Sequence, residues 1–317
     1  MDGKPDGRRT IDIGMSNHNE IRSGDWHTSE HAVLVKRIPA PFRTILGEGP
    51  VWLPRDQAVM WVDIFGESIH RLDLESGKLH QWSVGERIGW IVPRKGNPGY
   101  FAGLKSGFAF VTLAPFQLRR LRSPEPERPY NRLNDAKVDP AGRLWAGSKD
   151  DTDTQASGAL YRLDSSETEE RCDDGYRVAN GPTFSPDGKT LYHADTGLGL
   201  VYAFDLSATG ILSNRRIFVR FEDDWGYPDG MTTDARGGVW IAHWDGGRIS
   251  RFDPSGRLDR TIHLPTKRVT SMAFGGSDLD RLFVTTAAFG LEGDPLAGSL
   301  FEVDTGERGL PPVAFNG

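Results

Sequence analysis

Short runs of hydrophobic residues, interrupted by turn residues, extend along most of the chain. Apolar and polar positions tend to alternate within the runs, and β-branched and aromatic residues are enriched, as in 200–206 (LVYAFDL). A period of two is the spacing of a β-strand with one buried face, whereas a helix repeats every 3.6 residues. Gly, Pro and Asp separate the runs, and long amphipathic helical windows are absent. The pattern therefore predicts an all-β protein built from many short strands.

The pattern also repeats at a longer period. Three units begin at Asn134, Asn180 and Asp229, and each opens with a polar residue that leads into a short strand. In every unit a glycine follows eight positions later, before an aromatic-bearing second strand. These glycines are Gly142, Gly188 and Gly237. A fixed offset between opening residue and turn indicates repeated copies of one structural unit.

Looser copies of the unit begin at Glu48, Ile88 and Thr270, which gives six in all. Repeats of roughly 40–50 residues have the length of a four-stranded propeller blade. We therefore predict a six-bladed β-propeller with four-stranded blades around a central channel. The strand expected at 32–37 would pair with 301–304 (FEVD) and close the ring. Residues 31–317 form one domain in this interpretation, and residues 1–30 form a flexible leader.

Composition narrows the possible partners. The 317 residues carry a net charge of -6, and the basic residues are interleaved with acidic ones. Nucleic acid or an acidic membrane surface is therefore not expected as a partner. The apolar runs are too short for a spanning helix, no signal peptide is recognisable, and Cys172 is the only cysteine. We expect a cytoplasmic protein that is a monomer or weak oligomer.

The repeat predicts a metal site. The first strands of all blades run in the same direction along the channel, so their equivalent positions meet at one level. Glu48, Asn180 and Asp229 share such a position, and buried carboxylates without partners require a cation or a proton. Their ligand atoms are all oxygens, which suit one divalent ion among calcium, magnesium, manganese and iron(II), with zinc possible. Three protein ligands leave positions open for water and substrate.

The third unit supplies further candidates at the same mouth. Arg132 lies two residues before Asn134, so both side chains point to one side of the strand. A guanidinium and an amide can hydrogen-bond the hydroxyls or the carbonyl of a polyol ligand. The polar segment 150–157 (DDTDTQAS) interrupts this unit and is predicted to form a rim or lid over the channel. We call it the rim loop.

Five segments of the chain form a recognisable series of motifs: LGEGPVW (46–52), NRLNDAKVDPAGRLWAG (131–147), NGPTFSPDGKTLYHADT (180–196), YPDGMTTDARGGVWIAHWDGGRISRFDP (227–254) and FGGSDLDRLFVTTA (274–287). On these segments the chain resembles the SMP-30/gluconolactonase/regucalcin family of six-bladed propellers, and especially its bacterial sugar-lactonase branch. The resemblance spans nearly everything beyond the leader, and the motifs occur in the family's order and spacing.

The resemblance implies metal-dependent hydrolysis of a sugar (aldono-) lactone to the aldonic acid. Under it, Glu48, Asn180 and Asp229 hold the metal and Asp229 is also the catalytic base. Arg132 and Asn134 contact the substrate. Two other functions stay open, namely a metal-dependent esterase or phosphotriesterase and a non-catalytic calcium-binding propeller.

One segment departs from the family pattern. Regucalcin-like members carry an acidic substrate contact just after a Gly-Thr-Met in the third blade. This chain reads Gly-Ser-Lys-Asp-Asp-Thr over 147–152, so Asp151 or its neighbour Asp150 is the candidate contact. Lys149 changes the local charge, and the identity of the sugar stays open.

Overall fold

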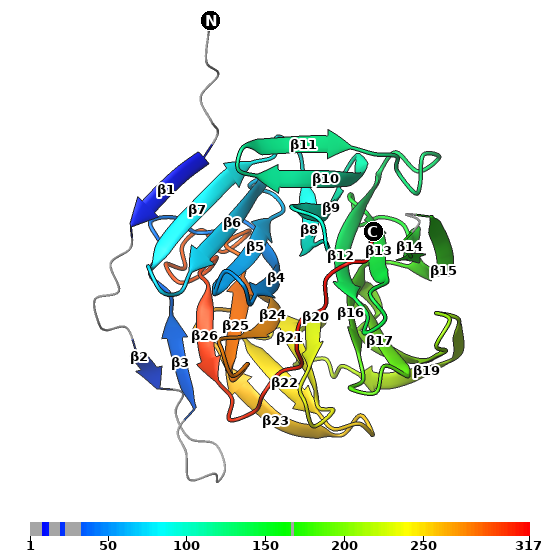
Figure 1. Ribbon diagram of the computed structural model, residues 1–317. Helices are drawn as coiled ribbons and strands as arrows, with labels where there is room; N and C mark the ends of the chain where they lie inside the picture. Colours follow the sequence, from blue (N-terminus) through cyan, green and yellow to red (C-terminus); the bar gives the residue numbers. More distant parts are fainter. Residues whose placement is uncertain (1–7, 13–19, 23–32, 166–167) are drawn as a thin grey trace, which may run out of the picture.

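The computed structural model describes residues 8–12, 20–22, 33–165 and 168–317. In this part of the chain the regular structure is β, apart from one 3-10 turn at Thr196–Leu198. Six sheets surround a central channel like the blades of a propeller, which confirms the predicted fold (Figure 1). No helix in the described ranges is long and apolar enough to cross a membrane.

The first strand of each repeat lies innermost, and the inner strands of neighbouring blades contact one another around the ring. We call the end of the channel where these strands begin the upper end. The six strands start within three residues of the predicted unit starts. They are β4 (Gly47–Leu53), β8 (Ile88–Pro93), β12 (Asn131–Val138), β16 (Ala179–Phe184), β20 (Tyr227–Thr233) and β24 (Val269–Gly275).

Each inner strand is followed outward by antiparallel neighbours in chain order, because hairpin turns connect them. The second strands are β5 (Ala58–Asp63), β9 (Tyr100–Leu104), β13 (Leu144–Asp150), β17 (Thr190–Asp195), β21 (Val239–Trp244) and β25 (Arg281–Thr286). The third are β6 (Ser68–Asp73), β10 (Gly107–Leu113), β14 (Gly158–Leu163), β18 (Leu200–Leu206), β22 (Arg248–Phe252) and β26 (Phe301–Asp304). The fourth are β7 (Lys78–Ser83), β11 (Phe116–Arg120), β15 (Glu169–Tyr176), β19 (Leu212–Arg220) and β23 (Leu258–His263).

The sixth blade takes its fourth strand from the other end of the chain. β3 (Leu34–Arg37) pairs antiparallel with β26, with Val35 opposite Val303. The predicted closure is confirmed. Two further strands, β1 (Arg8–Asp12) on β7 and β2 (Glu20–Arg22) on β3, fall in the range predicted as a flexible leader. The rest of that range lies outside the described residues, and its flexibility stays a prediction.

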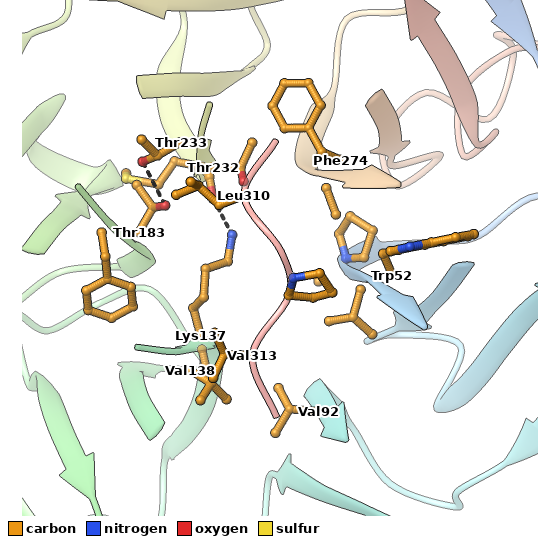
Figure 2. A pocket seen from close by; sticks show the side chains of 18 of the residues that line it. Trp52, Val92, Lys137, Val138, Thr183, Thr232, Thr233, Phe274, Leu310 and Val313 are labelled. Carbon is orange, nitrogen blue, oxygen red and sulfur yellow. Dashed lines mark hydrogen bonds between the residues drawn. The ribbon is translucent and has the colours of Figure 1, made fainter. Parts of the chain in front are cut away.

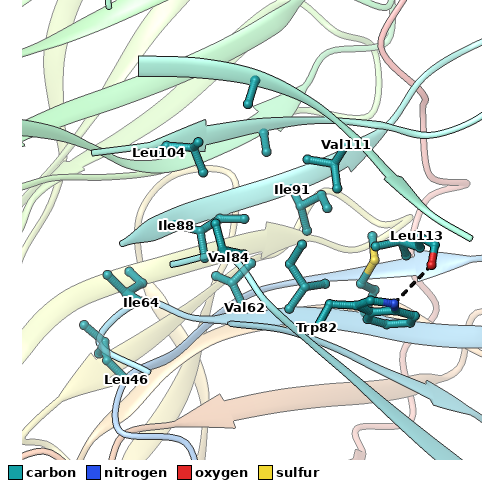
Figure 3. Close-up of a cluster of buried hydrophobic side chains, with 14 of the residues drawn as sticks. Leu46, Val62, Ile64, Trp82, Val84, Ile88, Ile91, Leu104, Val111 and Leu113 are labelled. Carbon is teal, nitrogen blue, oxygen red and sulfur yellow. Dashed lines mark hydrogen bonds between the residues drawn. The ribbon is translucent and has the colours of Figure 1, made fainter. Parts of the chain in front are cut away.

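Apolar side chains pack between neighbouring blades. The cluster between the first two blades includes Val62, Trp82 and Ile88, and the Trp82 indole donates a hydrogen bond to the Leu113 carbonyl at 3.1 Å (Figure 3). Burying the polar indole nitrogen with a partner avoids a desolvation penalty. Such inter-blade clusters fix the angle between blades and hence the positions of the inner strands.

The C-terminal segment crosses the lower end of the channel, and we call residues 310–317 the C-terminal strap (Figure 1). Phe315 is fully buried, and its ring centroid lies 5.1 Å from that of Phe101. Its backbone pairs with the second blade, where its N–H donates to the Pro93 carbonyl at 2.9 Å. The Asn316 N–H donates to Gly142 of the third blade at 3.0 Å. The strap therefore ties the lower faces of two blades together.

Candidate active site at the upper end of the channel

The three predicted metal ligands occupy equivalent positions in three blades. Glu48, Asn180 and Asp229 sit near the starts of three inner strands, and all three side chains are buried. In every inner strand the pairing register shifts just past this level. A β-bulge re-aims nearby side chains, and here it occurs where the candidate ligands leave the strand.

A glycine follows each of the three candidate ligands and makes the bulge sterically possible. Gly49 and Gly181 have φ values of 52° and 71°, in the left-handed region that favours glycine. A Cβ atom at Gly230 would lie 2.3 Å from the Ser271 hydroxyl oxygen, so only glycine fits between these two blades. The tripeptides Glu-Gly-Pro and Asn-Gly-Pro and the dipeptide Asp-Gly are therefore the local signal for this bulge.

A chain of hydrogen bonds joins the third blade to the fourth. The Arg132 guanidinium donates to the Asn134 side-chain oxygen at 2.6 Å. The Asn134 amide donates to the Asn180 side-chain oxygen at 2.8 Å, and the Asn180 amide donates to the Thr196 hydroxyl at 2.9 Å. Each side chain is thus held by its neighbour. Arg132 and Asn134 are thereby linked to one candidate ligand, Asn180, and their contact with substrate stays a prediction.

The carboxyl groups of the site require a cation or a proton beside them. Burial, followed by repulsion from Asp229 and Asp135, raises the pKa of Glu48 well above its usual value. Burial and Asp135 likewise raise the pKa of Asp229, whose carboxyl group is close enough to Glu48 to share a hydrogen bond. Two buried carboxyl groups at this separation cannot both be ionised without a cation beside them.

The donor set fits a divalent metal ion. It offers two carboxylates and the amide oxygen of Asn180, which are hard oxygen ligands. Within the described ranges, no group of three or more His, Cys, Asp and Glu side chains is arranged to hold a metal ion. The proposed set contains only two acidic residues, and its third ligand is an amide.

Residues 46–288 match the SMP-30/gluconolactonase/LRE-like family. The chain belongs to this family. Pentonolactonase from Haloferax volcanii is 37% identical over 282 residues, covering 84% of this chain and 93% of the relative. The 6-deoxy-6-sulfogluconolactonase of Pseudomonas putida is 33% identical over 280 residues, covering 86% and 96%. The crystal structure of regucalcin from Agrobacterium tumefaciens, a calcium-binding protein, superimposes with a TM-score of 0.83 at 26% identity, covering 89% and 97%.

Asp150 and Asp151, which lie where the sequence departs from the family pattern, have different contacts in the structure. The Asp151 carboxylate contacts the Arg132 Nε at 2.8 Å and the Lys105 Nζ at 2.7 Å, and it also pairs with Arg87. Burial opposes ionisation, but these three cations hold the pKa of Asp151 at about 2. Asp151 is therefore bound to the guanidinium predicted to contact the substrate.

Asp150 has a different task. Its carboxylate accepts hydrogen bonds from the backbone N–H groups of Thr152, Thr154 and Gln155 and from the hydroxyls of both threonines. Burial acts to raise the pKa of Asp150, but these hydrogen bonds outweigh it and hold the pKa below its usual range. Asp150 therefore organises the rim loop, which lies at the upper end beside Arg132.

Sequence reasoning missed Asp135, a third carboxylate beside Glu48 and Asp229. Its Oδ2 accepts the Gly181 N–H at 3.1 Å, and burial raises its pKa to about 6 although Lys137 opposes the shift. The repeat does contain a feature that could have identified Asp135. The positions equivalent to Asp135 in the next two units are both glycine, so a carboxylate there breaks the pattern.

A cavity of about 160 Å³ continues the channel below the candidate ligands. Lys137 points into it and donates a hydrogen bond to the Met231 carbonyl at 2.8 Å, while Leu310 and Val313 of the C-terminal strap cross its lower side (Figure 2). Burial lowers the pKa of Lys137 to about 8 despite its attraction to Asp135. The strap lies across this lower region, which places the candidate ligands at the opposite, upper end.

Proposed function

We propose that the protein is a divalent-metal-dependent hydrolase of a sugar lactone, producing the open aldonic acid. One observation supports this proposal most: the buried carboxyl groups of Glu48 and Asp229 lie close together, and Asn180 lies near the start of a neighbouring inner strand, where it accepts a hydrogen bond from the Asn134 that Arg132 contacts. The names of two relatives, a pentonolactonase and a 6-deoxy-6-sulfogluconolactonase, support the reaction class. We infer one metal ion per chain, held by Glu48, Asn180 and Asp229.

The bound ion would polarise the lactone carbonyl and stabilise negative charge on its oxygen. Asp229 accepts a proton from the attacking water as the general base. The bond between the carbonyl carbon and the ring oxygen then breaks, and the proton passes to the ring oxygen, which becomes a free hydroxyl of the aldonic acid. Arg132 and Asn134 bind substrate oxygens and hold the ring in place, since the guanidinium donates hydrogen bonds and the amide can donate and accept them. Asp151 orients the Arg132 guanidinium through the ion pair between them. A lactone is already an activated ester, so this scheme uses no covalent nucleophile.

Acid release from a panel of substrates tests the proposal. The protein is first stripped with a chelator and then supplied with calcium, magnesium, manganese, iron(II) or zinc. We expect sugar lactones to be turned over faster than aryl esters or phosphotriesters with at least one ion. Faster turnover of aryl esters or phosphotriesters would favour the second enzymatic function. Loss of stability on chelation without turnover of any substrate would favour a non-catalytic calcium-binding propeller.

A further inference from the structure

A buried lysine stands next to the substrate-binding arginine. Lys149 is the penultimate residue of β13 and lies directly opposite Arg132 on β12 in the antiparallel register. Side chains opposite each other in such a pair share one face, with Cβ atoms about 5 Å apart. Only 9% of the Lys149 side chain is exposed. A ligand that contacts Arg132 is therefore within reach of the Lys149 ammonium group.

An anionic group of a ligand could replace the present ion-pair partner of Lys149. The Lys149 ammonium forms an ion pair with Asp153, whose side chain is 61% exposed on the rim loop. A half-solvated carboxylate gives up little when another anion replaces it, whereas a buried ammonium must always keep a partner. Asp153 therefore occupies a position that an anionic group of a ligand can take.

The surroundings of Lys149 strengthen its demand for an anion. Burial lowers the pKa of Lys149, and the neighbouring Arg132 charge lowers it further. Lys149 in turn acts on the Asp229 carboxyl group, so the ammonium lies on the side of the site where catalysis is proposed. Arg132, Arg87 and Lys105 all pair with Asp151, so the direct ion-pair partner of Lys149 on the rim loop is the exposed Asp153.

This inference rests on the proposed function. We propose that Lys149 selects lactones that carry an anionic substituent, such as a carboxylate, phosphate or sulfonate, and that this substituent replaces Asp153 on the ammonium group. A neutral sugar lactone would leave the Lys149–Asp153 pair in place and would gain no binding energy from Lys149. The same contact supplies specificity, because a ligand without the anion cannot use it.

The test compares glucono-1,5-lactone with its 6-phosphate and with the 1,5-lactone of glucaric acid, using the metal-loaded full chain. We expect the wild-type kcat/KM for the charged lactones to exceed that for the neutral one at least tenfold. Lys149→Met should lower this ratio at least tenfold, mainly through KM. Asp153→Asn should raise the ratio, since the competing carboxylate is removed. A difference between the phosphate and the carboxylate identifies the preferred anion.

The matched control is Lys189→Met, because Lys189 is 79% exposed on the turn before β17 at the lower face and should leave the ratio unchanged. A wild-type preference for the neutral lactone, or a ratio that Lys149→Met does not change, would overturn the inference. Asp153→Asn affects an exposed side chain and decides the matter even if the lysine variant fails to fold. Failure to hydrolyse any lactone would instead defeat the proposed function, so the two failures are distinguishable.

Discussion

The two ends of the inner strand β20 carry aspartates in different surroundings. In the fifth blade Asp229 stands at the upper end of β20 beside Glu48, with a pKa raised by burial and by other carboxylates. Asp234 follows the lower end of the same strand, where its carboxylate accepts hydrogen bonds from Arg251 at 2.7 Å and Trp240 at 2.9 Å. Arg251 is bonded to Asp234, whereas among the described residues no basic side chain forms an ion pair with Asp229. The upper level is thus arranged for a ligand and the lower level for stability.

Asp229→Asn should have the largest effect on activity. Removing a general base that also contacts the metal is expected to lower kcat for the lactone by about 10²–10⁴-fold, while thermal unfolding changes little. Steady-state acid release and a melting curve measure both quantities. The control is Asp234→Asn, which breaks a buried ion pair and should cost about 3 kcal/mol of unfolding free energy with kcat retained. If Asp229→Asn lowered stability and Asp234→Asn lowered kcat, the assignment of activity to the upper end and of stability to the lower end would be contradicted.

Phe315→Ala tests the lower end by itself. The ring is fully buried against Phe101, so its removal should lower the free energy of unfolding by about 3–5 kcal/mol. Urea denaturation measures this loss, and the variant should keep wild-type kcat below its unfolding transition. Val313→Ala, at a residue that is 37% exposed, is the matched control and should change stability by less than about 0.5 kcal/mol. A strong loss of kcat in folded Phe315→Ala would place the strap in catalysis.

Asp151→Asn should have a smaller effect, on substrate binding. Arg132 would lose a charge-assisted hydrogen bond, and KM should rise about tenfold with a smaller change in kcat. Glu86→Gln is the control, because Glu86 pairs with Arg120, which is half exposed on the outer strand β11. An equal rise in KM in both variants would show that KM depends on the net charge around the channel mouth and not on the Asp151–Arg132 contact.

The same variant makes a prediction about pH. The folded-state pKa of Asp151 is about 2, below its usual value, so its ionised form stabilises the fold. This contribution is complete above about pH 4, the ordinary aspartate value, and disappears as the pH falls through 2. The stability difference between wild type and Asp151→Asn should therefore shrink across that window in acid denaturation curves. A stability difference between the two proteins that does not change with pH would show that the ion pairs of Asp151 are not its source.

The sequence predicted features that repeat along the chain. The six units and the neighbouring positions of Asn134 and Asn180 follow from an offset copied between blades, and the closing strand at 32–37 follows from the sixth unit lacking an outer strand. Repetition averages over local irregularities, so a register that recurs in three units is informative even where one copy is ambiguous. The same register placed Glu48, Asn180 and Asp229 at one level.

Contacts between segments that are not copies of one another could not be predicted from the sequence. Lys105 and Arg87 reach Asp151 from the second blade, and long flexible side chains leave no pattern in sequence that names their partner. The strap depends on Phe315, one aromatic in an irregular tail whose packing partner lies over two hundred residues earlier. Pairing of β1 and β2 on outer edges likewise depends on free sheet edges that exist only after the blades form.

Metal stoichiometry tests the central claim most directly. Chelated protein is titrated calorimetrically with the divalent ion that best restores activity, in the wild type and in the Glu48→Gln/Asp229→Asn double variant. We predict one ion bound per wild-type chain and none by the double variant at the same concentrations, with both proteins folded by circular dichroism. Equal binding by the two proteins, or no binding by the wild type, would contradict a metal centre at the upper end of the channel.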